Sequence, residues 1–233
     1  MIVTQDDEFI DQILSSVESI CKKYPEKYWL EMDKAQSYPT EFVKSMTESG
    51  HLNALIPTKY GGAGLSLLIA ARILEKIHQS GCNAAAAHAQ MYTMGSILKY
   101  GSETQKSKWL PLIAKGEVRL QAFGVSEPEA GTDTSSISTT AIRKENKYIL
   151  NGQKIWTSRA LHSDLMILLA KTKPKNERDS KSDGLSLFLI DMRESLGSGM
   201  IIRPIETMIN HSTTEVFFDN LEISSDNLLG IEN

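Results

Sequence analysis

Apolar residues recur at helical spacing through the first half of the chain. Between residues 9 and 20 they return every three or four positions and so share one helix face: Phe9, Ile10, Ile13, Leu14, Val17 and Ile20. Pro25 ends this helix, because its ring cannot continue the hydrogen-bond ladder. A second amphipathic helix is predicted over residues 39–49, with Pro39 in its first turn and Gly50 just past its end.

Two further segments have the composition of buried helices. Residues 66–80 contain the run LLIAARILEKIHQ, which is apolar on most faces, and residues 83–100 are rich in Ala and Met. We expect these two helices to pack against each other and form a core. The residues from Ser102 to Gln105 match a capping box, which starts a last helix that runs towards Lys115 and ends at Gly116.

After about Leu120 the pattern changes to short runs rich in Ile, Thr, Tyr and Phe, separated by turn residues. Asn151-Gly152 lies between KYIL and QKIWT, which predicts a hairpin with a type I′ turn at this pair. Further strands are predicted over residues 164–171, 184–191, 201–206 and 213–219, with a solvated charged loop over residues 173–183.

These patterns together predict an α+β protein of two domains. The boundary falls near residues 117–121, so that an all-α helical domain (residues 1–119) is followed by an antiparallel β-barrel or sandwich (residues 120–233).

Composition narrows the class of protein. The 233 residues are 41% hydrophobic and 23% charged, which is typical of a globular chain with a sizeable core. A net charge of −4 argues against nucleic acid as a partner, because no global basic field would hold phosphates. The longest apolar run, Leu67–Ala71, is too short for a membrane span, and the acidic N-terminus predicts no signal peptide. Cys21 and Cys82 are interpreted as reduced structural thiols, so we expect a cytoplasmic protein.

Several motifs have simple structural explanations. Gly61-Gly62-Ala63-Gly64 is interpreted as a flexible turn rather than a nucleotide loop, because no GxGxxG strand context precedes it and no Lys-Ser/Thr pair follows. The five histidines show no metal-ligand spacing, and no GxSxG elbow marks a serine nucleophile. No metal site is predicted.

Two stretches suggest chemistry: residues 122–133 (AFGVSEPEAGTD) and residues 151–158 (NGQKIWTS). Alternate residues of a strand share a face, so Lys154, Trp156 and Ser158 would project together and offer an aromatic plane beside a hydroxyl. Such a surface suits a flat heteroaromatic ring, but a Trp packed in a β core would give the same pattern. The pattern leaves both interpretations open.

Five stretches, taken in order, resemble the acyl-CoA dehydrogenase family and cover nearly the whole chain. They are PTKYGGAGLS from Pro57, YGSETQKSKWLPLIAKGE from Tyr100, AFGVSEPEAGTD, NGQKIWTS, and EVFFDNLEISSDNLLG from Glu215. The NHSTTE stretch from Asn210 departs from the family pattern, which has an Arg nearby.

The resemblance implies FAD as cofactor and assigns its contacts. Phe123, Val125 and Ser126 would lie along the isoalloxazine, Trp156 would pack on it, and the Ser158 hydroxyl would meet flavin N5. Thr132 would touch the CoA part of the substrate. The family's catalytic Glu belongs to a C-terminal helical bundle, so neither Glu127 nor Glu129 is assigned as the base and no catalytic residue is assigned in this chain.

The activity implied is α,β-dehydrogenation of an acyl-CoA thioester, with hydride transfer to the flavin and an electron-transfer flavoprotein as electron acceptor. The full-length form is expected to be a homo-oligomer. The chain is interpreted as a fragment without the bundle, which would bind FAD weakly and turn over little by itself. Alternatives are a related flavin oxidase or monooxygenase, or a non-catalytic interaction module without flavin.

Overall fold

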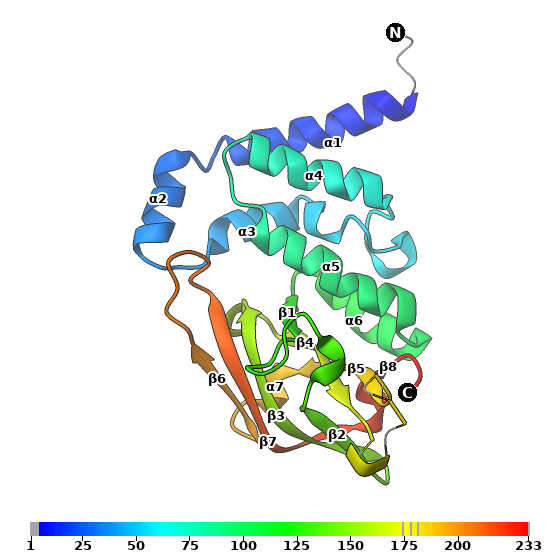
Figure 1. Ribbon diagram of the computed structural model, residues 1–233. Helices are drawn as coiled ribbons and strands as arrows, with labels where there is room; N and C mark the ends of the chain where they lie inside the picture. Colours follow the sequence, from blue (N-terminus) through cyan, green and yellow to red (C-terminus); the bar gives the residue numbers. More distant parts are fainter. Residues whose placement is uncertain (1–4, 174, 178, 181, 233) are drawn as a thin grey trace. The chain divides into compact units, whose positions relative to one another are not determined.

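The computed structural model describes residues 5–173, 175–177, 179–180 and 182–232, and their contacts group into two compact units (Figure 1). The helical unit comprises the residues up to Gly95 together with Thr104–Val118. The β unit comprises Ser96–Glu103 and the residues from Arg119 onwards. Each unit has its own hydrophobic cluster of buried side chains.

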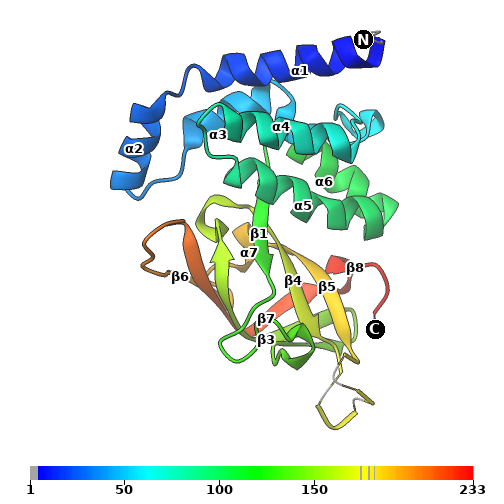
Figure 2. The ribbon, with the colours of Figure 1, turned by 45° about the horizontal axis from the view of Figure 1, so that its top comes forward.

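Helices and short 3₁₀ turns build the first part of the described chain (Figure 2). They are α1 (Gln5–Cys21), α2 (Glu26–Lys34), α3 (Thr40–Glu48), η1 (His51–Asn53), η2 (Thr58–Tyr60), α4 (Leu67–Gln79), α5 (Ala85–Tyr100) and α6 (Glu103–Lys115). In the core of the helical unit, one face of each of α1, α3 and α4 packs with the Ala-rich start of α5. Cys21 and Cys82 are buried in this core as free thiols.

The helical predictions are confirmed at α1, α3, α4, α5 and α6, with one omission and one correction. α1 ends at Cys21, before Pro25, as predicted, but Pro25 also stands as the N-cap of α2, a helix that the pattern did not predict. In α4, which follows the N-cap Ser66, only one face is buried, since Leu67 and Leu68 are 74% and 69% exposed. The same core holds Ile73 of α4 and Met91 of α5.

The β unit contains an eight-stranded sheet in the order β6-β7-β3-β2-β4-β5-β8, with β1 paired to β4 outside this path. The strands are β1 (Leu120–Gly124), β2 (Thr140–Lys144), β3 (Lys147–Ser158), β4 (Leu165–Lys171), β5 (Leu185–Asp191), β6 (Met200–Pro204), β7 (Thr213–Ser224) and β8 (Leu228–Leu229). The connections carry the short helices η3 (Thr134–Ser136), η4 (Ala160–His162), η5 (Lys175–Glu177), α7 (Met192–Ser195) and η6 (Ser225–Asn227).

The predicted α+β class is confirmed, and the sheet is mostly antiparallel. Two pairings depart from the antiparallel prediction. β1 runs parallel to β4, with Phe123 opposite Ile167, and Thr140 of β2 pairs in parallel with Lys171 of β4. The predicted charged loop falls partly on Pro174, Arg178 and Lys181, which lie outside the described residues, as do Met1–Thr4 of the acidic N-terminus.

The predicted hairpin at Asn151-Gly152 is wrong, because β3 runs through this pair without turning. The turn lies at Glu145-Asn146 instead, where Lys144 pairs with Lys147 and Glu145 adopts φ 55°. Gly152 serves a different purpose: its φ is 145°, and a Cβ there would lie 2.5 Å from Thr139 Oγ1. Glycine is therefore required by a register shift in β3 and by the close approach of Thr139, not by a turn.

Candidate functional site

The segment that follows β1 is fixed to β3 by three consecutive contacts. Lys154 Nζ donates to the carbonyl oxygen of Val125 at 3.0 Å, and the Ile155 N–H donates to the carbonyl oxygen of Ser126 at 2.9 Å. Lys154 Nζ also lies 2.7 Å from the Glu127 carboxylate. The two stretches selected from the sequence therefore meet within the β unit.

Lys154 and Glu127 form a buried ion pair, with side-chain exposures of 0% and 4%. The carboxylate also accepts from the Ser138 N–H at 2.6 Å, the Ser138 hydroxyl at 2.7 Å and the Thr139 N–H at 2.9 Å. Burial alone would raise the pKa of Glu127, but the Lys154 ammonium and the Thr139 and Ser138 donors outweigh it and lower the pKa to about 2. Burial also lowers the pKa of Lys154, and the Glu127 charge opposes that effect. The carboxylate is therefore ionised at neutral pH.

A bulge in β3 interrupts the alternation of side chains between the two faces of the strand at Trp156. The register with β7 shifts between Lys154 and Thr157, and Trp156 adopts φ 60°. Lys154 and Thr157 are both fully buried, whereas the Trp156 side chain is 59% exposed. The prediction that Lys154 shares a face with Trp156 and Ser158 is thus wrong, because the extra residue of the bulge reverses the alternation after Lys154.

The Ser158 hydroxyl lies at the end of β3 and is half-buried. Its Oγ accepts a hydrogen bond from the Asn210 amide at 2.9 Å. Asn210 itself adopts φ 57° in the connection between β6 and β7, and its carbonyl accepts from the Thr213 hydroxyl at 2.7 Å. Since the Ser158 oxygen is the acceptor in the first of these bonds, its own hydrogen can be donated to another group.

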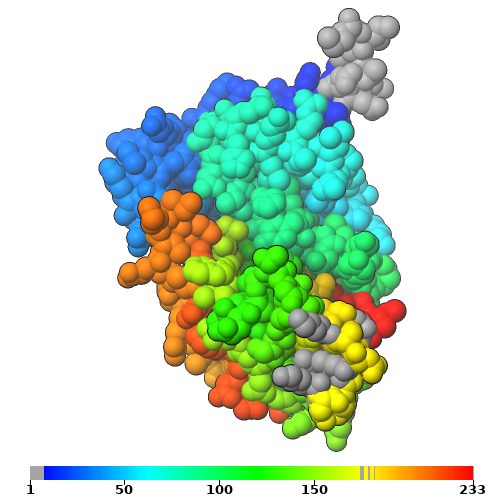
Figure 3. All heavy atoms as spheres, in the orientation of Figure 1, coloured from blue at the N-terminus to red at the C-terminus, as the bar shows by residue number. Residues whose placement is uncertain are grey.

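The other predicted contact residues occupy three neighbouring stretches of the chain. Phe123 is the outward residue of β1 and is 36% exposed. Val125 and Ser126 are half-buried beside β3. Thr132 lies exposed in the loop before η3. The segment that contains β1, this loop and η3 forms green surface at the front of Figure 3. The hydrogen bonds from Lys154 and Ile155 hold Val125 and Ser126 against β3. Thr132 lies further along the loop between β1 and η3.

Sequence reasoning missed two partners at this site. Glu127 was considered only as a base, and its pairing with Lys154 could have been suspected from two opposite charges within strongly apolar strand patterns. Asn210 lies in the stretch that departs from the family pattern, and only its contact with Ser158 reveals its place.

A flat heteroaromatic cofactor would fit the outer side of this bulge. An exposed indole offers a stacking plane, and a hydroxyl two residues further on can donate to a ring-edge atom. Among the described residues there is no cluster of three or more His, Cys, Asp or Glu side chains arranged to hold a metal ion. None of the described helices has the length and apolar character needed to cross a bilayer.

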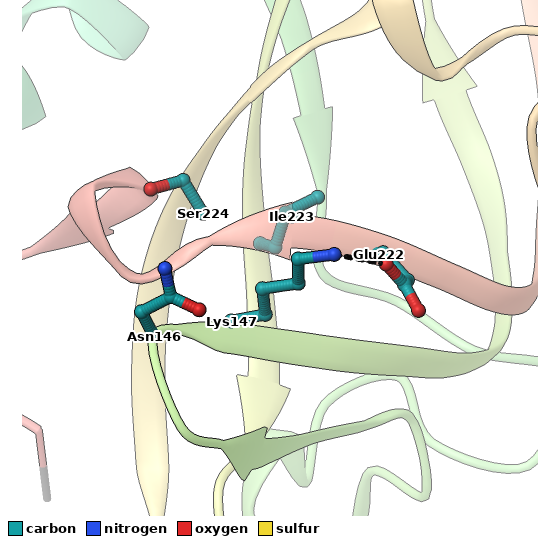
Figure 4. Close-up of a pocket in the computed structure, with 5 residues that line it drawn as sticks. All are labelled: Asn146, Lys147, Glu222, Ile223 and Ser224. Atoms are coloured by element: carbon teal, nitrogen blue, oxygen red, sulfur yellow. Dashed lines mark hydrogen bonds and ion pairs between the residues drawn. The ribbon is translucent and has the colours of Figure 1, made fainter.

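A separate hollow of about 240 Å³ lies at the Lys147 end of β3 (Figure 4). It is lined by Asn146, Lys147, Glu222, Ile223 and Ser224. The Lys147 ammonium points at the Glu222 carboxylate and contacts it at 2.7 Å, with both side chains more than half exposed. The two charges in this hollow therefore neutralise each other at the surface, far along the strand from Trp156.

The fold and the bulged site define an α+β protein with a helical unit followed by a mostly antiparallel sheet. The sequence matches the family descriptions "Acyl-CoA dehydrogenase, N-terminal domain" over residues 7–117 and "Acyl-CoA dehydrogenase, middle domain" over residues 122–221. The chain therefore belongs to the acyl-CoA dehydrogenase family.

Individual relatives agree with this assignment. The chain is 34% identical to an acyl-CoA dehydrogenase of Bacillus subtilis, covering 86% of this chain and 52% of that protein. It is 35% identical to a glutaryl-CoA dehydrogenase of Desulfococcus multivorans, covering 85% and 51%. The crystal structure of an acyl-CoA dehydrogenase from Geobacillus kaustophilus superposes with a TM-score of 0.87 at 29% identity, covering 97% of this chain and 59% of that one. The chain spans about half the length of the curated relatives it matches.

Proposed function

We propose that residues 120–233 form the flavin-facing domain of an FAD-dependent acyl-CoA dehydrogenase, with residues 1–119 as its helical domain. The observation that carries the proposal is the exposed Trp156 indole on a bulged strand, two residues before the Ser158 hydroxyl. Trp156 would stack on the isoalloxazine. Phe123, Val125 and Ser126 would also contact this ring system. Thr132 would touch the CoA part of the substrate.

The reaction proposed is α,β-dehydrogenation of an acyl-CoA thioester. Bound FAD supplies a hydride acceptor. The chain's own groups would orient that acceptor: Ser158 can donate its hydroxyl hydrogen to a ring-edge nitrogen while Asn210 holds its oxygen. The Trp156 indole would cover a ring face and exclude water from it. An electron-transfer flavoprotein would accept the electrons, and we infer a homo-oligomer for the full-length form.

For the 233 residues alone we expect little or no turnover. The base that removes the α-proton must accept a proton near neutral pH. Glu127 is unsuited to this step, because four donors hold its carboxylate and its pKa is about 2. Robust turnover of a pure acyl-CoA with an artificial electron acceptor would contradict this expectation. Oxygen consumption with the same substrate would favour a flavin oxidase instead.

The test of cofactor binding is an equilibrium titration of the purified chain with FAD, monitored by the visible absorption and the fluorescence of the flavin. We expect a bound flavin band in the parent, a weaker one in Trp156→Ala, and a shifted band in Ser158→Ala. Trp29→Phe in the helical unit is the matched control and should bind as the parent does. A folded parent that leaves FAD fluorescence unchanged over the whole titration would refute the flavin site and favour the interaction module.

The cytoplasmic location that we infer depends on Cys21 and Cys82 remaining thiols. Thiol labelling of the unfolded protein, taken directly from cells, should modify both residues. A disulfide or a secreted product would contradict the location.

A further inference from the structure

The backbone of Trp156 is held in a conformation that a bulky residue rarely adopts. A φ of 60° places this residue in the left-handed region, where its Cβ is crowded by the following carbonyl. Such a residue keeps this conformation only where its neighbours over-determine it. On the C-terminal side, the Thr157 carbonyl accepts from the Thr214 hydroxyl at 2.7 Å, and Thr157 pairs with Thr214 in the sheet.

On the N-terminal side, the anchor is the Lys154 side chain. Its stem runs over Gly124, where a Cβ would lie 3.3 Å from Lys154 Cγ. Its ammonium contacts the Val125 carbonyl at 3.0 Å and the Glu127 carboxylate at 2.7 Å. Glu127 in turn is fixed by the Ser138 and Thr139 amides. One buried ion pair therefore connects β3 to the segment 125–127 and to the segment 138–139.

We propose that Lys154 and Glu127 are positioning residues, which hold the Trp156 indole outwards and align residues 125–126 beside it. The part of this inference that concerns flavin rests on the proposed function. The part that concerns the Trp156 conformation does not, because it follows from the bulge and the ion pair alone. Lys154 and Glu127 are both buried, and both would act through the backbone of Trp156 and the carbonyl of Val125.

The expected consequence is a loss of pre-organisation. A ligand that binds only the outward conformation has an apparent Kd equal to its intrinsic Kd divided by the fraction of protein in that conformation. If loss of the ion pair lowers that fraction to about one tenth, the Kd for FAD rises about tenfold. The folded state can remain intact while this happens.

The experiment is fluorine NMR of the chain labelled with 5-fluorotryptophan. The chain has three tryptophans, Trp29, Trp109 and Trp156, and the first two belong to the helical unit. Trp156→Phe assigns the third resonance. In Lys154→Met we expect the Trp156 resonance to shift or broaden without FAD while the Trp29 and Trp109 resonances stay in place. The Kd for FAD should rise about tenfold under the same conditions. Glu222→Gln, which breaks an exposed pair of the same 2.7 Å length, should change neither measurement.

A purely structural role of the pair would give a different result. Lys154→Met would then be less stable, yet, where fully folded, it would keep the parent's Trp156 resonance and FAD affinity, and that result would overturn the proposal. If Lys154→Met does not fold, the double variant Glu127→Gln/Lys154→Met leaves no unpaired buried charge and is judged by the same two measurements. A Trp156 resonance that shifts in Lys154→Met, together with a parent that binds no FAD, would support the positioning role and refute the proposed function.

Discussion

Replacement of Glu127 by Gln would separate the two members of the buried pair and leave an ammonium in the interior. Lys154 has no exposed side-chain surface, and the Val125 carbonyl at 3.0 Å also accepts a hydrogen bond from its ammonium. Glu127 is better supported, because the Ser138 amide, the Ser138 hydroxyl and the Thr139 amide would remain if Lys154 were removed instead. The two single substitutions should therefore differ in their cost.

Loss of one partner from a buried pair costs about 3 to 5 kcal/mol, chiefly because the other charge is left unpaired. We expect Glu127→Gln to fall in this range. Lys154→Met should cost about 2 kcal/mol, since the carboxylate keeps three donors. At a urea dependence of about 2 kcal/mol per M, Glu127→Gln would lower the unfolding midpoint by about 2 M and Lys154→Met by about 1 M.

The assay is urea unfolding at pH 7, followed by circular dichroism and tryptophan fluorescence. Glu222→Gln is the matched control: it breaks an ion pair of the same length whose members are 53% and 58% exposed, so its midpoint should stay close to that of the parent. The double variant Glu127→Gln/Lys154→Met should lose less stability than the sum of its parts. Equal midpoint shifts for Glu127→Gln and Glu222→Gln would refute the reasoning, as would a larger loss from Lys154→Met than from Glu127→Gln.

Three more outcomes are expected. The pKa of Glu127 in the folded protein, about 2, lies below its ordinary 4.5, so its contribution is present above pH 4.5 and lost as the pH falls towards 2. The stability gap between the parent and Glu127→Gln should narrow by about 3 kcal/mol over that window in acid titrations of the urea midpoint. Gly152→Ala should lose more than about 2 kcal/mol, because its Cβ would meet Thr139 at 2.5 Å and its φ is 145°; a thermal midpoint equal to the parent's would contradict this. Gly95→Ala, inside α5 with no described atom within 4 Å of the new Cβ, should gain about 0.5 to 1 kcal/mol, and a loss in the same melt would show a hidden clash.

Elements with strong local signals were predicted close to their true bounds. Pro39 and Gly50 bracket α3, and Ser66 caps α4 by accepting from the Ile69 N–H at 3.3 Å. α2 was missed because Pro25 was interpreted only as the end of one helix, whereas proline is equally suited to precede another. The hairpin was misplaced because the pairing of β3 with β7 keeps Asn151-Gly152 within a continuous strand, although this pair favours a turn locally.

The site shows the same division between local and non-local information. The sequence placed Trp156 and Ser158 beside each other, and both lie at the end of β3. It could not predict the bulge, since positive φ at a tryptophan has no local signal. The partners of the site are also distant in the chain: Lys154 and Glu127 are 27 positions apart, and Ser158 and Asn210 are 52 apart. The spacing of apolar residues shows which residues share a face of one helix or strand, but not which elements contact each other.

The pairing of β3 with β7 also determines when the edge of β3 becomes covered during protein synthesis. Lys147 pairs with Ser224 and Ser158 with Thr213, so β3 gains this neighbour only after nearly the whole described chain has left the ribosome. Contacts between such distant segments form slowly, because a long loop must close before they can be made. Until then the strand that carries Trp156 has an open edge in the nascent protein, where pairing with another chain competes with folding. Any ligand of Trp156 therefore meets a finished binding surface only after β7 has left the ribosome and paired with β3.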